Sequence, residues 1–201
     1  MPNIQTADIG LGQTILRRAA ISPDQRALTF EGTTQTFAEL GDRVRRMAAV
    51  LRAGGISAGD RVGYIGLNHP IFLEMLYACG CLGAVFVPLN FRLTGPEVRF
   101  IANDAGISTM VADDMLRPLI DSERDNLQCT RYITAEADAD NWEPLEPLMA
   151  AATAIEASEK VDADFFNGEL YHCARTLTPR ATRLAPPAQQ GCPSGAHAHA
   201  F

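Results

Sequence analysis

Short apolar runs alternate with helical stretches between residues 59 and 112. The runs RVGYIGL, AVFVPL and STMVAD are each bounded by turn residues, which is typical of buried parallel strands. Strands alternating with helices in this way form a parallel sheet with helices packed on its faces and right-handed crossovers. We expect strands near residues 61–67, 84–88 and 108–112, and helices near residues 69–82 and 95–104.

Capping signals indicate where the helices begin. Thr36 followed by Glu39 predicts a capping box at the start of an amphipathic helix, and the stretch TGPE at residues 94–97 repeats the pattern. Before the apolar helix between the first two buried strands, Asn68 is expected to supply the N-cap oxygen. Pro70 would then lie near the first helical turn, where its missing N–H costs nothing.

The pattern continues on both sides of this region. Residues 26–37 alternate apolar and polar positions around Glu31-Gly32, which predicts a β-hairpin. A short helix around residues 115–122 and a strand around residues 130–134 extend the alternation. The expected fold class is therefore α/β, with a mostly parallel sheet flanked by helices.

The composition changes after residue 134. The next thirty residues hold nine acidic side chains against Lys160, which favours a solvated acidic linker with one amphipathic helix around residues 145–155. Beyond residue 165 there are few aliphatic side chains other than alanine, so we expect a largely disordered tail from about residue 175. The predicted organisation is a subdomain at 1–134, a linker at 135–164 and a divergent tail at 165–201.

Charge and cysteine content exclude several classes of protein. The 17 Lys and Arg against 24 Asp and Glu give a net charge of -7, the wrong sign for a protein that neutralises nucleic-acid phosphates. No run of about 18 apolar residues predicts a transmembrane segment. Five scattered cysteines, an odd number in a chain of this length, favour the reducing cytoplasm. All but one of the basic side chains are arginines, which favours a GC-rich bacterial source.

One stretch resembles a known family. Residues 59–106 read GDRVGYIGLNHPIFLEMLYACGCLGAVFVPLNFRLTGPEVRFIANDAG. GDRV at the start of a strand, LN before a buried helix, the GAVFVPLN strand and the RLTGPEV capping box have the order and spacing of the N-terminal subdomain of AMP-forming acyl-CoA synthetases, or fatty-acid–CoA ligases. The similarity covers roughly residues 10–135 and implies a partial N-terminal subdomain of that fold.

The resemblance also implies a chemistry. Members of the family form an acyl adenylate from a carboxylic acid and ATP with magnesium, and then the thioester with coenzyme A. Their phosphate loop has the form YTSGTTGxPKG, whose backbone amides cradle the anion. At the corresponding place this chain reads GELYHCARTLTPRATRL, and no glycine occurs between Gly168 and Gly191. Only residues 170–171 and 178–180 echo the ends of the motif, so the backbone cannot approach a phosphate as the family's loop does.

Two functions follow as hypotheses. The first is a fatty-acid or other carboxylate–CoA ligase by descent, truncated before the phosphate loop and inactive alone, with no catalytic, cofactor-binding or metal-binding residues of its own. A frameshift, a sequencing error, a decayed gene and a selected short variant all fit that truncation. The alternative is a non-catalytic interaction or regulatory module that pairs with a homologous synthetase or with a partner that completes its sheet. ATP, magnesium and coenzyme A are expected for the full-length family and not for this chain.

Reactive residue types in the tail have plain explanations. Cys192 with His197 and His199 offers types that bind metals, but a terminal AHAHAF without a second cysteine pair favours no metal site. Three tail arginines lie close to the acidic linker, which favours charge neutralisation over nucleic-acid binding. They are Arg175, Arg180 and Arg183.

Candidates nearer the centre of the chain also have structural interpretations. Cys79 and Cys81 lie in the predicted buried helix and are interpreted as core packing. His69 is interpreted as a turn residue, and Lys160 is given no catalytic role because no glycine loop surrounds it. The pairs Arg17-Arg18 and Arg45-Arg46 are expected on solvated helix faces, where peripheral membrane contact would suit a fatty-acid enzyme.

Overall fold

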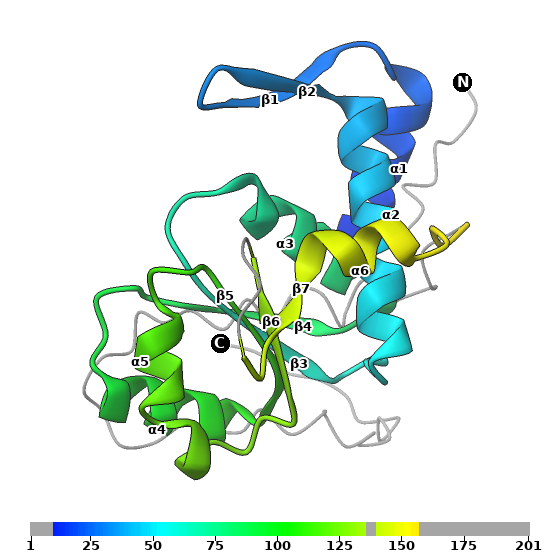
Figure 1. Ribbon diagram of the computed structural model, residues 1–201. Coiled ribbons are helices and arrows are strands. Elements are labelled where there is room, and N and C mark those ends of the chain that lie inside the picture. Colours follow the sequence, from blue (N-terminus) through cyan, green and yellow to red (C-terminus); the bar gives the residue numbers. More distant parts are fainter. Residues whose placement is uncertain (1–9, 136–139, 157–201) are drawn as a thin grey trace, which may run out of the picture.

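The N-terminal part of the described chain consists of two helices with a β-hairpin between them. A computed structural model describes residues 10–135 and 140–156 (Figure 1). The hairpin turn uses Glu31 and Gly32, with φ of 46° and 80°, the region that favours a tight two-residue turn. The predicted hairpin is thus confirmed. This part comprises α1 (Leu11–Ile21), β1 (Arg26–Phe30), β2 (Thr33–Thr36) and α2 (Phe37–Ala53).

A five-stranded sheet forms the centre of the molecule. Its order is β4-β3-β5-β6-β7, and every neighbouring pair is parallel. The predicted parallel arrangement is confirmed, and each of the four predicted strands begins within one residue of its expected start. The strands are β3 (Arg61–Ile65), β4 (Val85–Leu89), β5 (Ile107–Ala112), β6 (Arg131–Thr134) and β7 (Glu143–Pro144).

Helices cover both faces of the sheet and create two cores. One core contains α1, α2, α3 and α6, and the other contains α4 and α5. Successive residues of a strand point to opposite faces, so Phe86 enters the first core while Val85 and Val87 enter the second. This two-sided burial explains why the strands read as continuous apolar runs. The remaining helical elements are α3 (Pro70–Leu82), α4 (Gly95–Ala105), α5 (Arg117–Asp121), the 3-10 turn η1 (Arg124–Asn126) and α6 (Leu145–Ala151).

Two glycines allow α1 to approach α3 closely. A Cβ atom at Gly80 would lie 2.8 Å from the backbone nitrogen of Gly12, and one at Gly12 would lie 2.7 Å from Cα of Cys81. Both distances are shorter than real Cβ contacts, so any side chain here would push the helices apart. The close approach of α1 therefore explains why a glycine lies between Cys79 and Cys81.

The segment interpreted as an acidic linker is packed where the structure describes it. Trp142, Leu145 and Met149 are buried, and α6 starts at the expected residue but ends at Ala151. Two of its acidic side chains are paired with arginines: Glu146 with Arg43, and Glu143, which accepts hydrogen bonds from Nε and Nη2 of Arg131 at 2.8 and 2.9 Å. The charge pattern alone did not show that apolar residues between the acidic ones belong to a core. The tail expected to be disordered lies outside the described residues.

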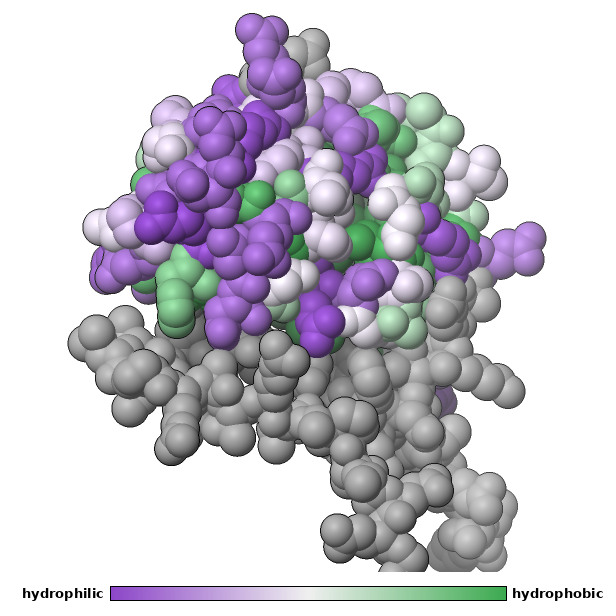
Figure 2. Space-filling model, turned by 90° about the horizontal axis from the view of Figure 1, so that it is seen from below, coloured by the Kyte–Doolittle hydropathy of each residue, from purple (hydrophilic) through white to green (hydrophobic). Residues whose placement is uncertain are grey.

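The surface of the described part is largely hydrophilic in one view. Seen from below, hydrophobic residues occupy small areas between hydrophilic ones (Figure 2). Within residues 10–135 and 140–156, no helix has the length and apolar character needed to cross a membrane.

Candidate functional site

The strand order indicates at which edge of the sheet a ligand would bind. The chain steps from β3 to β4 in one direction and then from β4 to β5 in the other, on the far side of β3. In open α/β sheets, ligands bind outside the carboxyl ends of the strands at such a switch point. The loops that follow β3, β4 and β5 lie together at the left of Figure 1.

Asp113 ties the loops at this switch point together. Its carboxylate accepts hydrogen bonds from the backbone N–H groups of Leu67 at 2.8 Å and Leu116 at 3.1 Å. Its own N–H donates to the carbonyl of Ile65 at 3.1 Å. Asp113 therefore links the end of β3 to the start of the segment that leads into α5.

The side chains of Asp114, Thr134 and Tyr64 also make hydrogen bonds at this edge of the sheet. Oδ1 of Asp114 accepts a hydrogen bond from the Thr134 hydroxyl at 2.8 Å and lies 3.5 Å from Nε of Arg117. The Tyr64 hydroxyl donates to the carbonyl of Leu67 at 3.2 Å, and a Cβ atom at Gly66 would collide with that hydroxyl. These groups hold the loops, and general acid or base chemistry would have to break these contacts.

Three apolar side chains line the outside of this edge. Leu67, Phe91 and Met115 follow β3, β4 and β5, and they are 40%, 42% and 72% exposed. We call Leu67, Phe91 and Met115 the edge patch. Because the three strands are neighbours in register, the edge patch gathers exposed apolar side chains from three loops at one end of the sheet.

The N-termini of α2 and α4 already hold anionic groups. The Glu39 carboxylate accepts from the backbone N–H of Thr36, and that of Glu97 accepts from the backbone N–H of Thr94, each at 2.8 Å. These bonds lower the pKa of both carboxyl groups. Both predicted capping boxes are confirmed. An ionised carboxylate at each position repels a phosphate.

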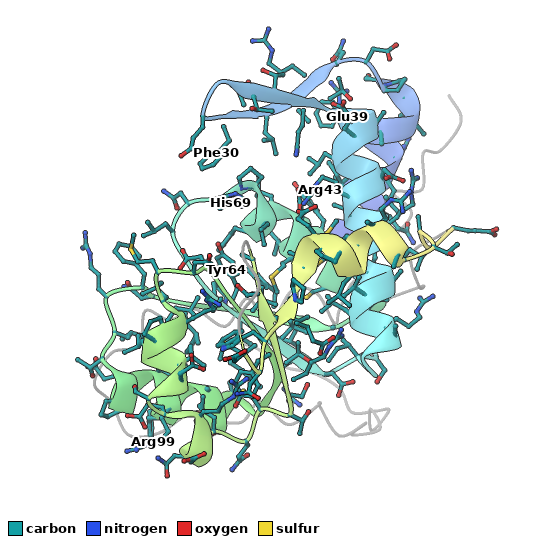
Figure 3. The ribbon with its side chains drawn as sticks, in the orientation of Figure 1. Phe30, Glu39, Arg43, Tyr64, His69 and Arg99 are labelled. Atoms are coloured by element: carbon teal, nitrogen blue, oxygen red, sulfur yellow. The ribbon has the colours of Figure 1, made fainter. Side chains whose placement is uncertain are left out.

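The N-terminus of α3 is closed by His69. Its Nδ1 accepts a hydrogen bond from the N–H of Ile71 at 3.2 Å, and its ring meets the edge of Phe30 from the hairpin at 5.0 Å (Figure 3). The prediction that Asn68 supplies the cap was wrong, because the helix begins one residue later and an imidazole nitrogen takes that role. Pro70 follows at the first helical position as expected, and it has no N–H to offer an anion.

At the start of each of α2, α3 and α4, one backbone N–H already has a side-chain partner within the chain. Phosphate binding needs several converging backbone amides. The family's loop corresponds to residues that lie outside the described part.

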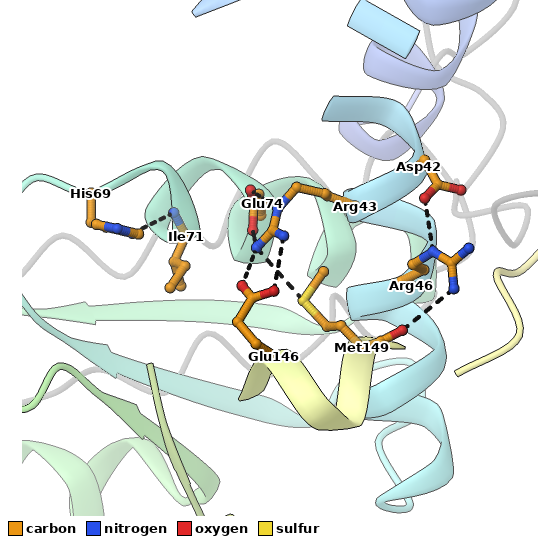
Figure 4. A network of polar contacts seen from close by, with 8 residues as sticks. All are labelled: Asp42, Arg43, Arg46, His69, Ile71, Glu74, Glu146 and Met149. Atoms are coloured by element: carbon orange, nitrogen blue, oxygen red, sulfur yellow. Dashed lines mark hydrogen bonds and ion pairs between the residues drawn. The ribbon is translucent and has the colours of Figure 1, made fainter. Parts of the chain in front are cut away.

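A buried carboxylate on α3 is paired with an arginine on α2. The side chain of Glu74 is 0% exposed, and its two oxygens accept from Nε and Nη2 of Arg43, the latter bond measuring 3.0 Å. Arg43 also donates from Nη2 to Glu146 of α6 at 2.6 Å (Figure 4). One guanidinium thus joins three helices.

Arg46, one turn further along α2, holds the other end of α6. Its Nη1 donates to the carbonyl of Ala152 at 2.9 Å. Its Nη1 also donates to the carbonyl of Met149 at 3.5 Å, and its Nε pairs with Asp42 at 2.7 Å (Figure 4). The side chain of Arg46 is 35% exposed, so it lies partly on a solvated face as expected, but its guanidinium also binds the end of α6. Its guanidinium neutralises carbonyls that the helix end leaves without partners.

The ion pairs change the pKa values of their members. Burial acts to lower the pKa of Arg43, but its bonds to Glu146 and Glu74 outweigh burial and raise it. The bond from Arg43 lowers the pKa of Glu146, and the bond from Arg131 lowers that of Glu143. Arg43, Glu143 and Glu146 are therefore charged at neutral pH.

Acid should weaken the fold through Glu146. Its pKa in the folded chain lies below the ordinary value of 4.5, so its contribution is complete above that value and is lost as the pH falls through the folded-state value. Between pH 7 and pH 3 we expect the wild type to lose about 0.5–1 kcal/mol more of its free energy of unfolding than Glu146→Gln. Urea denaturation at both pH values measures this. Glu156→Gln, at an exposed position, should behave like the wild type; equal losses in all three chains would contradict the assignment.

The cysteines within the described part are packing residues. Cys79 and Cys81 are buried in α3, and burial raises the pKa of both thiols, that of Cys81 to about 11. Cys129 is also buried, and its pKa is raised to about 11. Such thiols are protonated at neutral pH and react poorly as nucleophiles. Within the part of the chain that the structure describes, no group of three His, Cys, Asp or Glu side chains is arranged to bind a metal.

A hollow of about 310 Å³ opens between α2 and α6. Half of its lining residues are alanines, and Arg131 contributes to its wall. Nη1 of Arg131 donates to the carbonyl of Val50 at 2.9 Å, and its other nitrogens hold Glu143. The arginine is therefore a structural bridge between β6, β7 and α2.

The sequence singled out other residues that lie outside the described part. They are Lys160, Arg175, Arg180, Arg183, Cys192, His197 and His199. The sequence reasoning also missed the pair of Arg43 and Glu74. A signal was present, since Glu74 is the one charged residue in the apolar helix PIFLEMLYACGCL, and such a charge needs a partner.

Known proteins share this fold and sequence. The family model described as AMP-binding enzyme matches residues 15–187. The chain is 53% identical over 102 residues to a feruloyl-CoA synthase of Amycolatopsis sp, covering 51% of this chain and 21% of that protein. It is 34% identical over 149 residues to a long-chain-fatty-acid–CoA ligase of Mycobacterium tuberculosis, covering 73% and 30%.

A solved structure agrees with these matches. The structure of a Mycobacterium tuberculosis fatty acyl CoA synthetase superimposes with a TM-score of 0.68 at 33% identity, covering 75% of this chain and 30% of that one. The chain thus spans between a fifth and a third of the length of these relatives. The family match extends to residue 187 and so includes the stretch at which the phosphate loop is expected.

Proposed function

Because the chain belongs to the AMP-binding enzyme family, we propose that it carries part of the scaffold of a carboxylate–CoA ligase and does not form an acyl adenylate by itself. The relatives named above act on ferulate and long-chain fatty acids, so the substrate class is a carboxylic acid with an aromatic or aliphatic body. The carboxylic acid, ATP and coenzyme A would be the reactants of the whole enzyme, with magnesium as the metal that accompanies ATP. The contribution of this part is to hold a parallel sheet and its loops in place.

The occupied helix N-termini carry this proposal. The carboxylates of Glu39 and Glu97 and the imidazole of His69 each accept a hydrogen bond from one backbone amide at a helix start. The stretch at residues 171–180 has larger side chains where the family's loop has glycines. Adenylation also requires that all reacting groups be positioned together.

We expect no measurable binding of ATP to the isolated chain. Calorimetric titration with ATP and magnesium should give no saturable heat, and no pyrophosphate should be released when ferulate or a long-chain fatty acid is added. A ligase of the family that contains the glycine-rich loop is the positive control. Saturable binding in the micromolar range (about -8 kcal/mol), or carboxylate-dependent pyrophosphate release, would contradict the proposal.

The edge patch favours a second function, in which the chain pairs with a homologous synthetase. Exposed apolar side chains gathered from three loops are typical of interaction surfaces. We expect Phe91→Asp with Met115→Asp to abolish co-sedimentation with a full-length ligase of the family. Phe100→Asp, at an exposed position on α4, should leave it unchanged. Absence of co-sedimentation for the unaltered chain would exclude this second function.

A further inference from the structure

The start of α3 is capped by an imidazole nitrogen. Pro70 stands at the first helical position and has no N–H, so the N–H of Ile71 is the first donor that the helix must satisfy. Nδ1 of His69 accepts it at 3.2 Å (Figure 4). A ring nitrogen accepts such a bond only while it carries no proton, because both nitrogens of a protonated imidazole are donors. The observed cap therefore requires a neutral His69 with its proton on Nε2.

The same ring connects α3 to the hairpin. Its centroid lies 5.0 Å from that of Phe30, the last residue of β1, and the two ring planes meet at 72° (Figure 3). The residues of β1 and β2 are exposed or half-buried, so the core holds the hairpin only in part. The position of the imidazole thus affects both the helix start and the turn end of the hairpin.

His69 is the one histidine among the residues that the structure describes, since the other three lie outside that part of the chain. Histidine is the side chain that ordinarily changes charge between about pH 5 and pH 8. The residue is partly exposed, so a proton from water can reach the ring. Protonation leaves the N–H of Ile71 without its acceptor and places a positive charge at a helix N-terminus, which the helix dipole disfavours.

A carboxylate on α6 offers the protonated ring another partner. The pKa of Glu146 is lowered by its bond from Arg43 and also by the charge of His69, so the two side chains are close enough to attract each other. A protonated ring therefore gains by leaving Ile71 and turning toward Glu146. The other charged groups of the surrounding elements have partners of their own or are exposed: Arg43 is bonded to Glu74, Glu39 to Thr36 and Asp113 to the loops after β3 and β5, while Glu31 is exposed.

We propose that His69 is a pH-sensitive cap that links the start of α3 to the hairpin. At about pH 8 the neutral ring accepts the N–H of Ile71 and holds Phe30. As the pH falls toward about 5, Nδ1 takes a proton from water, releases that N–H and turns toward Glu146. The turn end of the hairpin then loses its contact with α3, while the sheet and both cores stay intact.

Nuclear magnetic resonance of the full-length chain between about pH 8 and pH 5.5 tests the proposal. Glu146 stays ionised throughout this range, because its pKa lies below 4.5. The ring signals of His69 and the amide signal of Ile71 should titrate with one common midpoint. Nuclear Overhauser contacts between the rings of His69 and Phe30 should weaken by about threefold or more, as for the loss of an N-cap. The amide signal of Val62 in β3 should not move.

Two variants assign the effect to this side chain. His69→Asn keeps an N-cap acceptor that takes no proton in this range, so the chain should fold and the Ile71 amide should no longer titrate. Replacing the other three histidines with glutamine should leave the titration of Ile71 unchanged. They are His172, His197 and His199.

Three results would overturn the proposal. One is an Ile71 amide signal that stays constant while the His69 ring titrates. Another is the same movement of Ile71 in His69→Asn, which would assign the titration to a carboxyl group. The third is a loss of signals across the whole sheet over the same range, which would mean global unfolding and not local release. None of these measurements uses ligase activity, so the test is independent of the proposed function.

Discussion

Arg43→Met is expected to lower the free energy of unfolding by about 3–5 kcal/mol, because it leaves the carboxyl group of Glu74 buried and without its partner. The Glu74 side chain is 0% exposed, and both of its oxygens accept bonds from Arg43. Water cannot replace the guanidinium at this depth without opening the contact between α2 and α3. Urea denaturation followed by circular dichroism measures the loss.

Two further variants separate the buried charge from lost packing. Arg43→Met combined with Glu74→Met removes both charges and should recover most of the stability, since apolar pairs of similar volume often replace buried ion pairs without cost. Arg99→Met removes the partner of Glu123 at a more exposed site and should cost less than about 1 kcal/mol. Arg43→Met could lower the free energy of unfolding by no more than Arg99→Met does. That result would mean that the burial of Glu74 does not require its ion pair with Arg43.

Leu145→Ala should lower the free energy of unfolding by about 2–5 kcal/mol, the range for a large buried side chain cut back to alanine. Leu145 is 0% exposed and belongs to the core formed by α2 and α3, although it lies in a stretch that charge alone assigns to a linker. The same denaturation experiment measures the effect. It tests whether α6 is an integral part of the fold.

Leu67→Ala is the matched control, because it removes the same atoms from a side chain that is 40% exposed. Its cost should be less than about 1 kcal/mol, since the lost atoms were already partly in water. Similar losses in the two variants would mean that α6 is not packed as described. If Leu145→Ala lowered the free energy of unfolding by less than about 1 kcal/mol, α6 would again not be packed as described.

Local signals predicted most of the fold. Capping boxes at Thr36 and Thr94 and the turn at Glu31-Gly32 act over three or four residues, so their physics is complete within a short window of sequence. The parallel sheet followed from the alternation of apolar runs and helices. His69 escaped this reasoning because histidine is seldom an N-cap residue and Asn68 is a common type for that role.

Long-range contacts were beyond the reach of the sequence pattern. Arg43 and Glu146 are 103 residues apart, and no local rule connects them. The edge patch depends on three loops that meet only because the strands are neighbours in register. For the same reason the acidic side chains after residue 134 predicted a solvated linker. Trp142 and Leu145, which lie among these acidic residues in the sequence, are each buried in one of the two cores.

The burial of Trp142 gives the chain a built-in optical probe. It is the single tryptophan of the sequence, its ring lies 5.4 Å from that of Tyr132, and its Nε1 donates to Asp121 at 2.9 Å. The guanidinium of Arg124 lies 3.9 Å from the Tyr132 ring centroid and 5.2 Å from that of Trp142. Emission excited at the indole band therefore reports on the β6 and β7 side of the sheet and not on α1 or the hairpin. Comparing that emission with far-ultraviolet circular dichroism would show whether the two ends of the molecule unfold in one transition.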